Sequence, residues 1–179
     1  MIRVYEPSIG KEEIKFVLNA VKNGELSGTF GKYIETFEKE FANYSGCKYG
    51  VAVSSGTTAL HLAVSAAGIK QGDEVILSSS TNIATALSIV HNGAIPVPVD
   101  CEEHTWNLDV NLLESIITKK TKAIIPVHLF GHPVDMVELM KIAKKYNLIV
   151  IEDCAESHGA SYKRKMTGSF GDMGCFSFY

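Results

Sequence analysis

The spacing of hydrophobic positions along the chain changes near residue 47. Before that point, apolar side chains recur every three or four residues in two stretches, the spacing of one face of an α-helix. These side chains are Ile14, Val17, Leu18 and Val21 in the first stretch and Ile34, Phe37, Phe41 and Tyr44 in the second. Asn23-Gly24 and Gly46 follow the two stretches and read as helix ends.

Beyond residue 47, short apolar runs alternate with helical patterns. The runs predict strands over residues 49–53, 74–77, 95–99, 123–127, 148–151 and 175–178. The patterns between them predict helices over residues 58–67, 83–91, 111–117 and 134–146. The strands are rich in β-branched residues and almost wholly apolar, as expected when helices cover both faces of a sheet. We therefore predict an α/β fold, a three-layer α/β/α arrangement around a mostly parallel sheet, with residues 1–179 in one domain.

Composition narrows the class of protein. Of the 179 residues, 46% are hydrophobic and 21% are charged, and the formal net charge is −3, which is ordinary for a soluble globular chain. This balance argues against nucleic acid or an anionic membrane as a partner. The sequence contains no apolar run of about 18 residues, and its first residues lack a signal-peptide core. We expect a cytoplasmic protein.

The four cysteines are widely separated. They are Cys47, Cys101, Cys154 and Cys175, and none forms a CxxC pair. This spacing suggests neither a zinc site nor a disulfide framework, so we expect reduced thiols.

Ser54-Ser55-Gly56-Thr57-Thr58 joins a predicted strand to a predicted helix. Small residues in such a turn expose backbone N–H groups, and the helix dipole adds partial positive charge, which together favour a phosphate group. The turn is not a Walker loop, because GxxxxGK[ST] is missing. An ordinary strand-to-helix connection with a serine or threonine N-cap is the alternative interpretation.

The segment Glu152-Asp153-Cys154-Ala155-Glu156-Ser157-His158 places two acids at the end of an apolar strand. Ligands gather at the carboxyl ends of strands in open α/β sheets, and a carboxylate there can face a cationic ring nitrogen. One alternative is a metal site made by Asp153, Glu156 and His158, although their spacing matches no familiar metal motif. Another is a purely structural role in which Asp153 caps the next turn.

A third segment runs from Gly168 to Tyr179, with the sequence GSFGDMGCFSFY. Its glycines permit tight turns, and Ser177 comes near the end of the strand predicted there. A turn followed by a core strand is the plain interpretation.

Taken together and in this order, the three segments resemble the DegT/DnrJ/EryC1/StrS sugar aminotransferases, a family of fold-type I pyridoxal-phosphate (PLP) enzymes. The resemblance extends over the whole chain. It includes Pro7-Ser8-Ile9-Gly10, Leu26-Ser27-Gly28, Val127-His128-Leu129-Phe130-Gly131 and Asp135-Met136. The run EDCAESHGA especially resembles the corresponding segment of enzymes such as perosamine synthases. Those enzymes aminate C4 of a nucleotide-bound 4-keto-6-deoxy sugar. The resemblance implies that residues 1–179 form the PLP-binding large domain, without the C-terminal small domain.

The resemblance also implies roles for individual residues. Gly56, Thr57, Thr58 and Ser177 are expected to hold the PLP phosphate. Asp153 is expected to pair with the pyridine nitrogen, and Ala155 to pack under one face of the ring. Glu156 is expected near the ring 3-hydroxyl or the reacting imine, which makes Asp153 and Glu156 the catalytic candidates. Asn82 stands where many relatives carry a stacking aromatic residue, and N-capping of the following helix is its alternative role.

The implied reaction takes an amino group from glutamate and delivers it to a GDP-, UDP- or dTDP-linked keto sugar, for surface polysaccharide or O-antigen synthesis. It needs a Schiff-base lysine, expected about three residues beyond Tyr179 and therefore outside the sequence. A PLP-dependent sugar dehydratase with histidine at that position is one alternative. A non-catalytic PLP-binding domain and an inactive, incomplete chain are others. Family members are usually homodimers, so Leu26 to Gly31 are expected to approach the partner's site.

Overall fold

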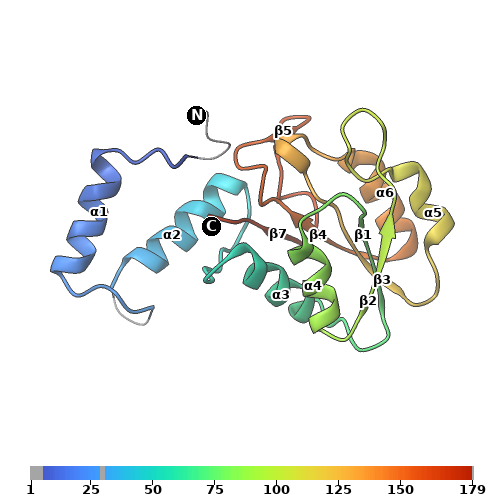
Figure 1. Ribbon diagram of the computed structural model, residues 1–179, viewed down its shortest axis with the longest axis horizontal. Helices are drawn as coiled ribbons and strands as arrows, with labels where there is room; N and C mark the ends of the chain where they lie inside the picture. The colour runs from blue at the N-terminus through green and yellow to red at the C-terminus, as the bar shows by residue number, and fades with distance from the viewer. Residues whose placement is uncertain (1–5, 29–30, 179) are drawn as a thin grey trace.

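The computed structural model describes residues 6–28 and 31–178. Its centre is a five-stranded sheet in the order β2-β1-β3-β4-β7, and each neighbouring pair is parallel (Figure 1). The strands are β1 (Glu74–Ser78), β2 (Ile95–Val99), β3 (Thr121–Ile125), β4 (Ile149–Asp153) and β7 (Met173–Cys175). The helices are α1 (Lys11–Lys22), α2 (Tyr33–Ser45), α3 (Gly56–Ala66), α4 (Ile83–His91), α5 (Leu113–Ile116) and α6 (Met136–Tyr146). Two 3-10 turns cover Val110–Leu112 and Leu129–Gly131.

Two hydrophobic cores cover the two faces of the sheet. Because successive strand residues point to opposite faces, each central strand supplies both cores. Leu77, Ile125 and Ile151 pack with residues of α3 and α4, including Val64 and Ile89. Ile76, Ile124 and Val150 pack on the other face with residues of α5 and α6, including Leu113 and Leu139. The predicted three-layer α/β/α architecture with a parallel sheet is confirmed.

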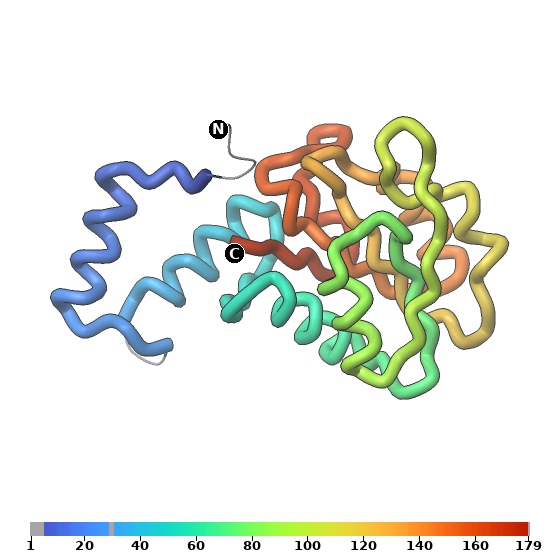
Figure 2. The backbone as a smooth tube through the Cα atoms, in the orientation of Figure 1, coloured from blue at the N-terminus to red at the C-terminus, as the bar shows by residue number. Residues whose placement is uncertain are grey.

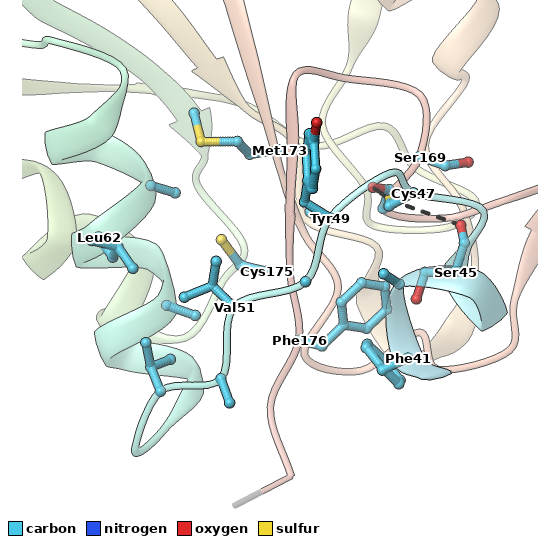
Figure 3. Close-up of a pocket in the computed structure, with 18 of the residues that line it drawn as sticks. Phe41, Ser45, Cys47, Tyr49, Val51, Leu62, Ser169, Met173, Cys175 and Phe176 are labelled. Atoms are coloured by element: carbon cyan, nitrogen blue, oxygen red, sulfur yellow. Dashed lines mark hydrogen bonds between the residues drawn. The ribbon is translucent and has the colours of Figure 1, made fainter. Parts of the chain in front are cut away.

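The predicted strand over residues 49–53 is wrong. This segment belongs to no helix or strand among the described residues. A largely apolar cavity of about 640 Å³ is lined both by this segment and by residues of β7, as Figure 3 shows with Tyr49 and Val51 across from Met173 and Cys175. The Val51 side chain is consequently 69% exposed. The alternating Val51 and Val53 favour extended backbone, but no strand in the described part of the chain pairs with this segment.

The last predicted strand also differs from the structure. Residues 175–178 were expected to be extended in the sheet, whereas β7 pairs with β4 through Met173, Gly174 and Cys175. The structure adds a short antiparallel hairpin, β5 (Ser161–Tyr162) with β6 (Lys165–Met166). Its turn residues Lys163 and Arg164 have φ angles of 49° and 70° and are exposed.

The N-terminal helices lie to one side of the sheet. Figure 2 shows the α1 tube standing apart from the main body, and none of its residues is buried. Of the segment Leu26 to Gly31, residues 29 and 30 lie outside the described part of the chain. None of the described helices is long and apolar enough to cross a membrane.

Candidate functional site

Helix α3 begins directly after the small-residue turn. Ser55 is its N-cap: the Ser55 hydroxyl accepts from the Thr58 backbone N–H at 3.2 Å, and Thr58 Oγ1 accepts from the Ser55 N–H at 2.9 Å. Thr58 Oγ1 also donates to the Ser55 carbonyl oxygen at 2.7 Å. The Thr58 hydroxyl therefore stabilises the turn itself. Gly56 and Thr57 contribute the first two N–H groups of the helix, which have no acceptor within a helix.

Gly56 and Ser177 bring the first and third sequence segments together. A Cβ placed on Gly56 would lie 2.6 Å from the Ser177 Cβ and 3.0 Å from its Oγ. Only a residue without a side chain fits at position 56, because such separations are far below van der Waals contact. The start of α3 and the chain after β7 therefore form one polar corner of the molecule.

Asp153 ends β4 and is 4% exposed. Its Oδ2 accepts from the Thr85 hydroxyl at 2.7 Å, and its Oδ1 accepts from the Ala155 N–H at 3.1 Å. No ion pair to Asp153 occurs among residues 6–28 and 31–178. Burial raises the pKa of Asp153, and the hydrogen bond from Thr85 opposes this shift. Thr85 itself is fully buried on α4, and no sequence motif points to it.

Glu156 and Ala155 follow Asp153 on an exposed turn. The Glu156 carboxylate accepts from the Phe130 backbone N–H at 2.8 Å. Phe130 has a φ of 49°, unusual for a bulky residue, and its side chain is 87% exposed. Glu156 therefore fixes the turn of residues 129–131, whose next member, Gly131, also has a positive φ.

Asn82 is the N-cap of α4. Its side-chain oxygen accepts from the Ala84 N–H at 3.0 Å, as the capping alternative predicts.

His158 packs among aromatic rings. The centroid of its own ring lies 4.9 Å from that of Phe178 and 5.4 Å from that of Phe176. Burial lowers the pKa of His158, as expected for a histidine among aromatic side chains.

Glu152, the acid that precedes Asp153 in the segment, points towards the core on the opposite face of the sheet from Asp153. It is fully buried and lies close to His128 and Cys154, three groups whose spacing could suit a metal ion. However, both Glu152 oxygens accept hydrogen bonds from N–H groups, and both His128 ring nitrogens are engaged as well. The three groups are therefore arranged as a hydrogen-bonded network. Asp153, Glu156 and His158, the alternative metal set, have the separate surroundings given above.

The groups at the start of α3, together with Ser177 and Asp153, fit PLP chemically. The first N–H groups of α3 beside Ser177 suit a phosphate dianion, because a helix N-terminus attracts negative charge. The Gly56–Ser177 approach leaves that corner free of a side chain at position 56. A buried carboxylate whose pKa burial raises suits a cationic partner such as a protonated pyridine nitrogen, because the opposite charge offsets its desolvation.

The fold and these residues define a class of α/β proteins. Its members have a parallel sheet, a helix N-terminus suited to binding an anion, and a buried acid at the carboxyl end of a strand. Comparison with known proteins makes the class specific. Residues 7–179 match the model of the DegT/DnrJ/EryC1/StrS aminotransferase family, and the chain belongs to that family.

Individual relatives are similar along nearly the whole chain. GDP-perosamine synthase from Escherichia coli O157:H7 is 47% identical over 178 residues, which cover 99% of this chain and 49% of the relative. The crystal structure of an aminotransferase from Psychrobacter cryohalolentis has a TM-score of 0.94 at 42% identity, covering 96% of this chain and 44% of that one. E. coli GDP-4-keto-6-deoxy-D-mannose-3-dehydratase with bound hydrated PLP superposes with a TM-score of 0.91 at 33% identity, covering 97% and 46%. The chain spans about half the length of the curated relatives it matches.

Proposed function

We propose that this chain is the cofactor-binding part of a PLP-dependent aminotransferase. Its reaction moves an amino group from glutamate to a nucleotide-linked 4-keto-6-deoxy sugar, for surface polysaccharide synthesis. The observation that carries the proposal is the buried Asp153 carboxylate. Thr85 and Ala155 hold it, and it forms no ion pair with a side chain of residues 6–28 and 31–178. The high identity to GDP-perosamine synthase supports the sugar and the GDP carrier.

In this proposal each residue of the site has a distinct task. Gly56, Thr57 and Ser177 hold the phosphate, while Thr58 braces the turn through its bonds to Ser55. When bound, PLP provides a protonated ring that withdraws electron density while a proton moves at the amino-bearing carbon. Asp153 keeps that ring nitrogen protonated, and Thr85 holds the carboxylate in place. The proposal also requires a lysine that carries the proton, which the family resemblance leads us to expect about three residues after Tyr179.

Ala155, Glu156 and Asn82 complete the proposed site. Ala155 leaves room for one ring face because its side chain is a single methyl group. Glu156 stands near the ring hydroxyl or the reacting nitrogen and at the same time holds the exposed Phe130 turn. Asn82 contributes by capping α4, the helix that carries Thr85. We further propose a homodimer in which the N-terminal segment around Leu26 faces the partner's site.

The test is a reaction of the full-length enzyme with PLP, glutamate and GDP-4-keto-6-deoxy-mannose, followed by mass spectrometry. Formation of 2-oxoglutarate together with a GDP-linked amino sugar is the expected result. Amination of UDP- or dTDP-linked sugars in preference to the GDP sugar would reassign the nucleotide. Failure with all three carriers would contradict the proposal.

A dehydratase is the second candidate, because a dehydratase with bound PLP is among the similar structures. The same assay separates the two. A dehydratase removes a hydroxyl group from the sugar, so its product lacks one oxygen and carries no new nitrogen. Isotopically labelled glutamate nitrogen in the product would exclude this candidate.

A further inference from the structure

Glu152 is bonded far more completely than its neighbour Asp153. Its Oε1 accepts from the backbone N–H groups of Phe170 and Gly171, each at 2.7 Å. Its Oε2 accepts from the Gly168 N–H at 2.8 Å and from His128 Nε2 at 3.0 Å. Every strong acceptor direction of an ionised carboxylate is thus occupied by an N–H donor.

The protonation state of His128 follows from its other partner. The Val134 backbone N–H donates to His128 Nδ1 at 3.1 Å, so that nitrogen carries no proton. Nε2 then carries the proton and donates it to Glu152. His128 is fully buried and orients the carboxylate as a neutral side chain.

These bonds connect the two halves of the proposed site. The loop of residues 168–171 is separated from β7 by Asp172 alone, and the chain after β7 brings Ser177 against Gly56. On the other side, the His128 N–H donates to the Asp153 carbonyl oxygen at 3.1 Å, and the Asp153 N–H donates to the Pro126 carbonyl at 2.9 Å. Glu152 therefore joins the strand end that carries Asp153 to the loop that places Ser177.

We propose that Glu152, oriented by His128, is a positioning residue for cofactor binding: it fixes the 168–171 loop on β4 and so sets the placement of Ser177 relative to Asp153. This inference rests on the proposed function, because it concerns the same PLP site. It adds a residue that touches neither phosphate nor ring.

Glu152→Gln is the sharpest change, because both carboxylate oxygens face N–H donors. Whichever way the amide is turned, its NH₂ group meets two of these donors, and backbone N–H groups cannot reverse their role. Asp172→Asn is the matched control. Asp172 is the exposed residue between the 168–171 loop and β7. It accepts from the Val150 N–H at 2.9 Å, and an asparagine oxygen can take that bond. Leu139→Ala, in the core beneath α6, is the control for general destabilisation.

The measurements are equilibrium dialysis of full-length variants against PLP and hydrogen exchange of the 168–171 amides without PLP. We expect Glu152→Gln to raise the PLP Kd by about tenfold or more and to speed exchange in the loop. Asp172→Asn and Leu139→Ala should stay within about twofold of wild type in Kd. An unchanged Kd in Glu152→Gln, or an equal loss in Leu139→Ala at the same fall in Tm, overturns the proposal.

A milder variant covers the case in which Glu152→Gln does not fold. His128→Gln leaves the three loop N–H groups on Glu152 and alters the fourth donor, together with the acceptor of the Val134 N–H. PLP should therefore bind severalfold more weakly, and exchange in the 168–171 loop should rise first at Gly168. Unchanged Kd and unchanged protection at Gly168 would contradict the orienting role. If wild-type protein retains no PLP, the proposed function fails, and hydrogen exchange alone then decides whether Glu152 holds the loop.

Discussion

Thr85 on α4 donates a hydrogen bond of 2.7 Å to Asp153 at the end of β4. The two residues are 68 positions apart in the sequence, and both are buried. Thr81, which stands four residues earlier and before the start of α4, has its Oγ1 2.7 Å from Thr85 Oγ1. Because the single proton of Thr85 goes to the carboxylate, Thr81 supplies the proton between the two hydroxyls, and the polar chain runs from Thr81 through Thr85 to Asp153.

Replacing Thr85 by valine removes the hydroxyl and keeps the shape. The buried Asp153 carboxylate then lacks one of its two donors, and we expect a loss of about 1–3 kcal/mol in the free energy of unfolding at neutral pH. Urea unfolding of wild type and Thr85→Val would measure it. The deficit should shrink in acid, where Asp153 is protonated and needs its donor less. Thr85→Ser keeps the hydroxyl, and a similar loss in that variant would point to packing instead.

Replacing Asp153 by asparagine separates stability from cofactor binding. Burial raises the pKa of Asp153 in the folded protein, so ionisation opposes folding. This cost is absent below the pKa of the unfolded chain, grows as pH rises, and is complete above the folded pKa. Without cofactor, Asp153→Asn should therefore unfold at a Tm equal to or above wild type at pH 7, with the difference vanishing near pH 3. The Thr85 hydroxyl can accept from the new amide and donate to Thr81 instead.

The same variant should bind PLP weakly, because a neutral amide cannot keep a ring nitrogen protonated. Dialysis against PLP, run beside the thermal melts, gives both quantities on one preparation. Undiminished PLP affinity in Asp153→Asn would remove Asp153 from the site.

Gly56→Ala tests the contact between the start of α3 and Ser177. The added Cβ has to displace Ser177, so we expect a destabilisation of about 1–3 kcal/mol and weaker PLP retention. Combining it with Ser177→Gly removes the colliding side chain. The double variant should recover much of the lost stability while still binding PLP poorly, since Ser177 is gone. No recovery of Tm in the double variant would mean that the collision lies elsewhere.

The cysteines should react in an order set by burial. Cys154 and Cys175 are buried, which raises the pKa of Cys175 to about 12 and that of Cys154 well above its ordinary value. Burial also raises the pKa of the partly exposed Cys47. At pH 8 we expect a thiol reagent to label Cys101 first and to reach Cys154 and Cys175 only after unfolding. Peptide mapping after timed labelling measures the order, and early labelling of Cys175 would contradict it.

Much of the fold follows from the sequence because the pattern is local. Apolar strands alternating with amphipathic helices predicted the three layers, and helix α4 begins and ends at the predicted residues. Residues 49–53 show where local pattern fails: Val51 and Val53 favour extended backbone, whereas a strand also needs a partner. The beginning of α3 at Gly56 instead of Thr58 follows from Ser55 acting as the N-cap.

Residues of the candidate site could be predicted only where they belong to one of the three sequence segments. Gly56, Asp153 and Ser177 stand in recognisable segments, and the structure brings Gly56 and Ser177 into contact. Thr85 had no such signal, because one threonine in an apolar helix is common and its partner is distant in sequence. Two adjacent acids do not by themselves show which one faces the site. The family resemblance pointed to Asp153, and the alternation of β4 places Asp153 and Glu152 on opposite faces.

The open side of β7 has a consequence for how this protein behaves in solution. No strand among the described residues pairs with its outer edge, and the apolar cavity beside it is walled by Val51, Leu62 and Phe176. Unpaired backbone next to apolar walls is a template for any extended segment that arrives, including that of a misfolded neighbour. We therefore expect this edge to promote aggregation of residues 1–179, and a charged residue in place of Val51 should reduce it.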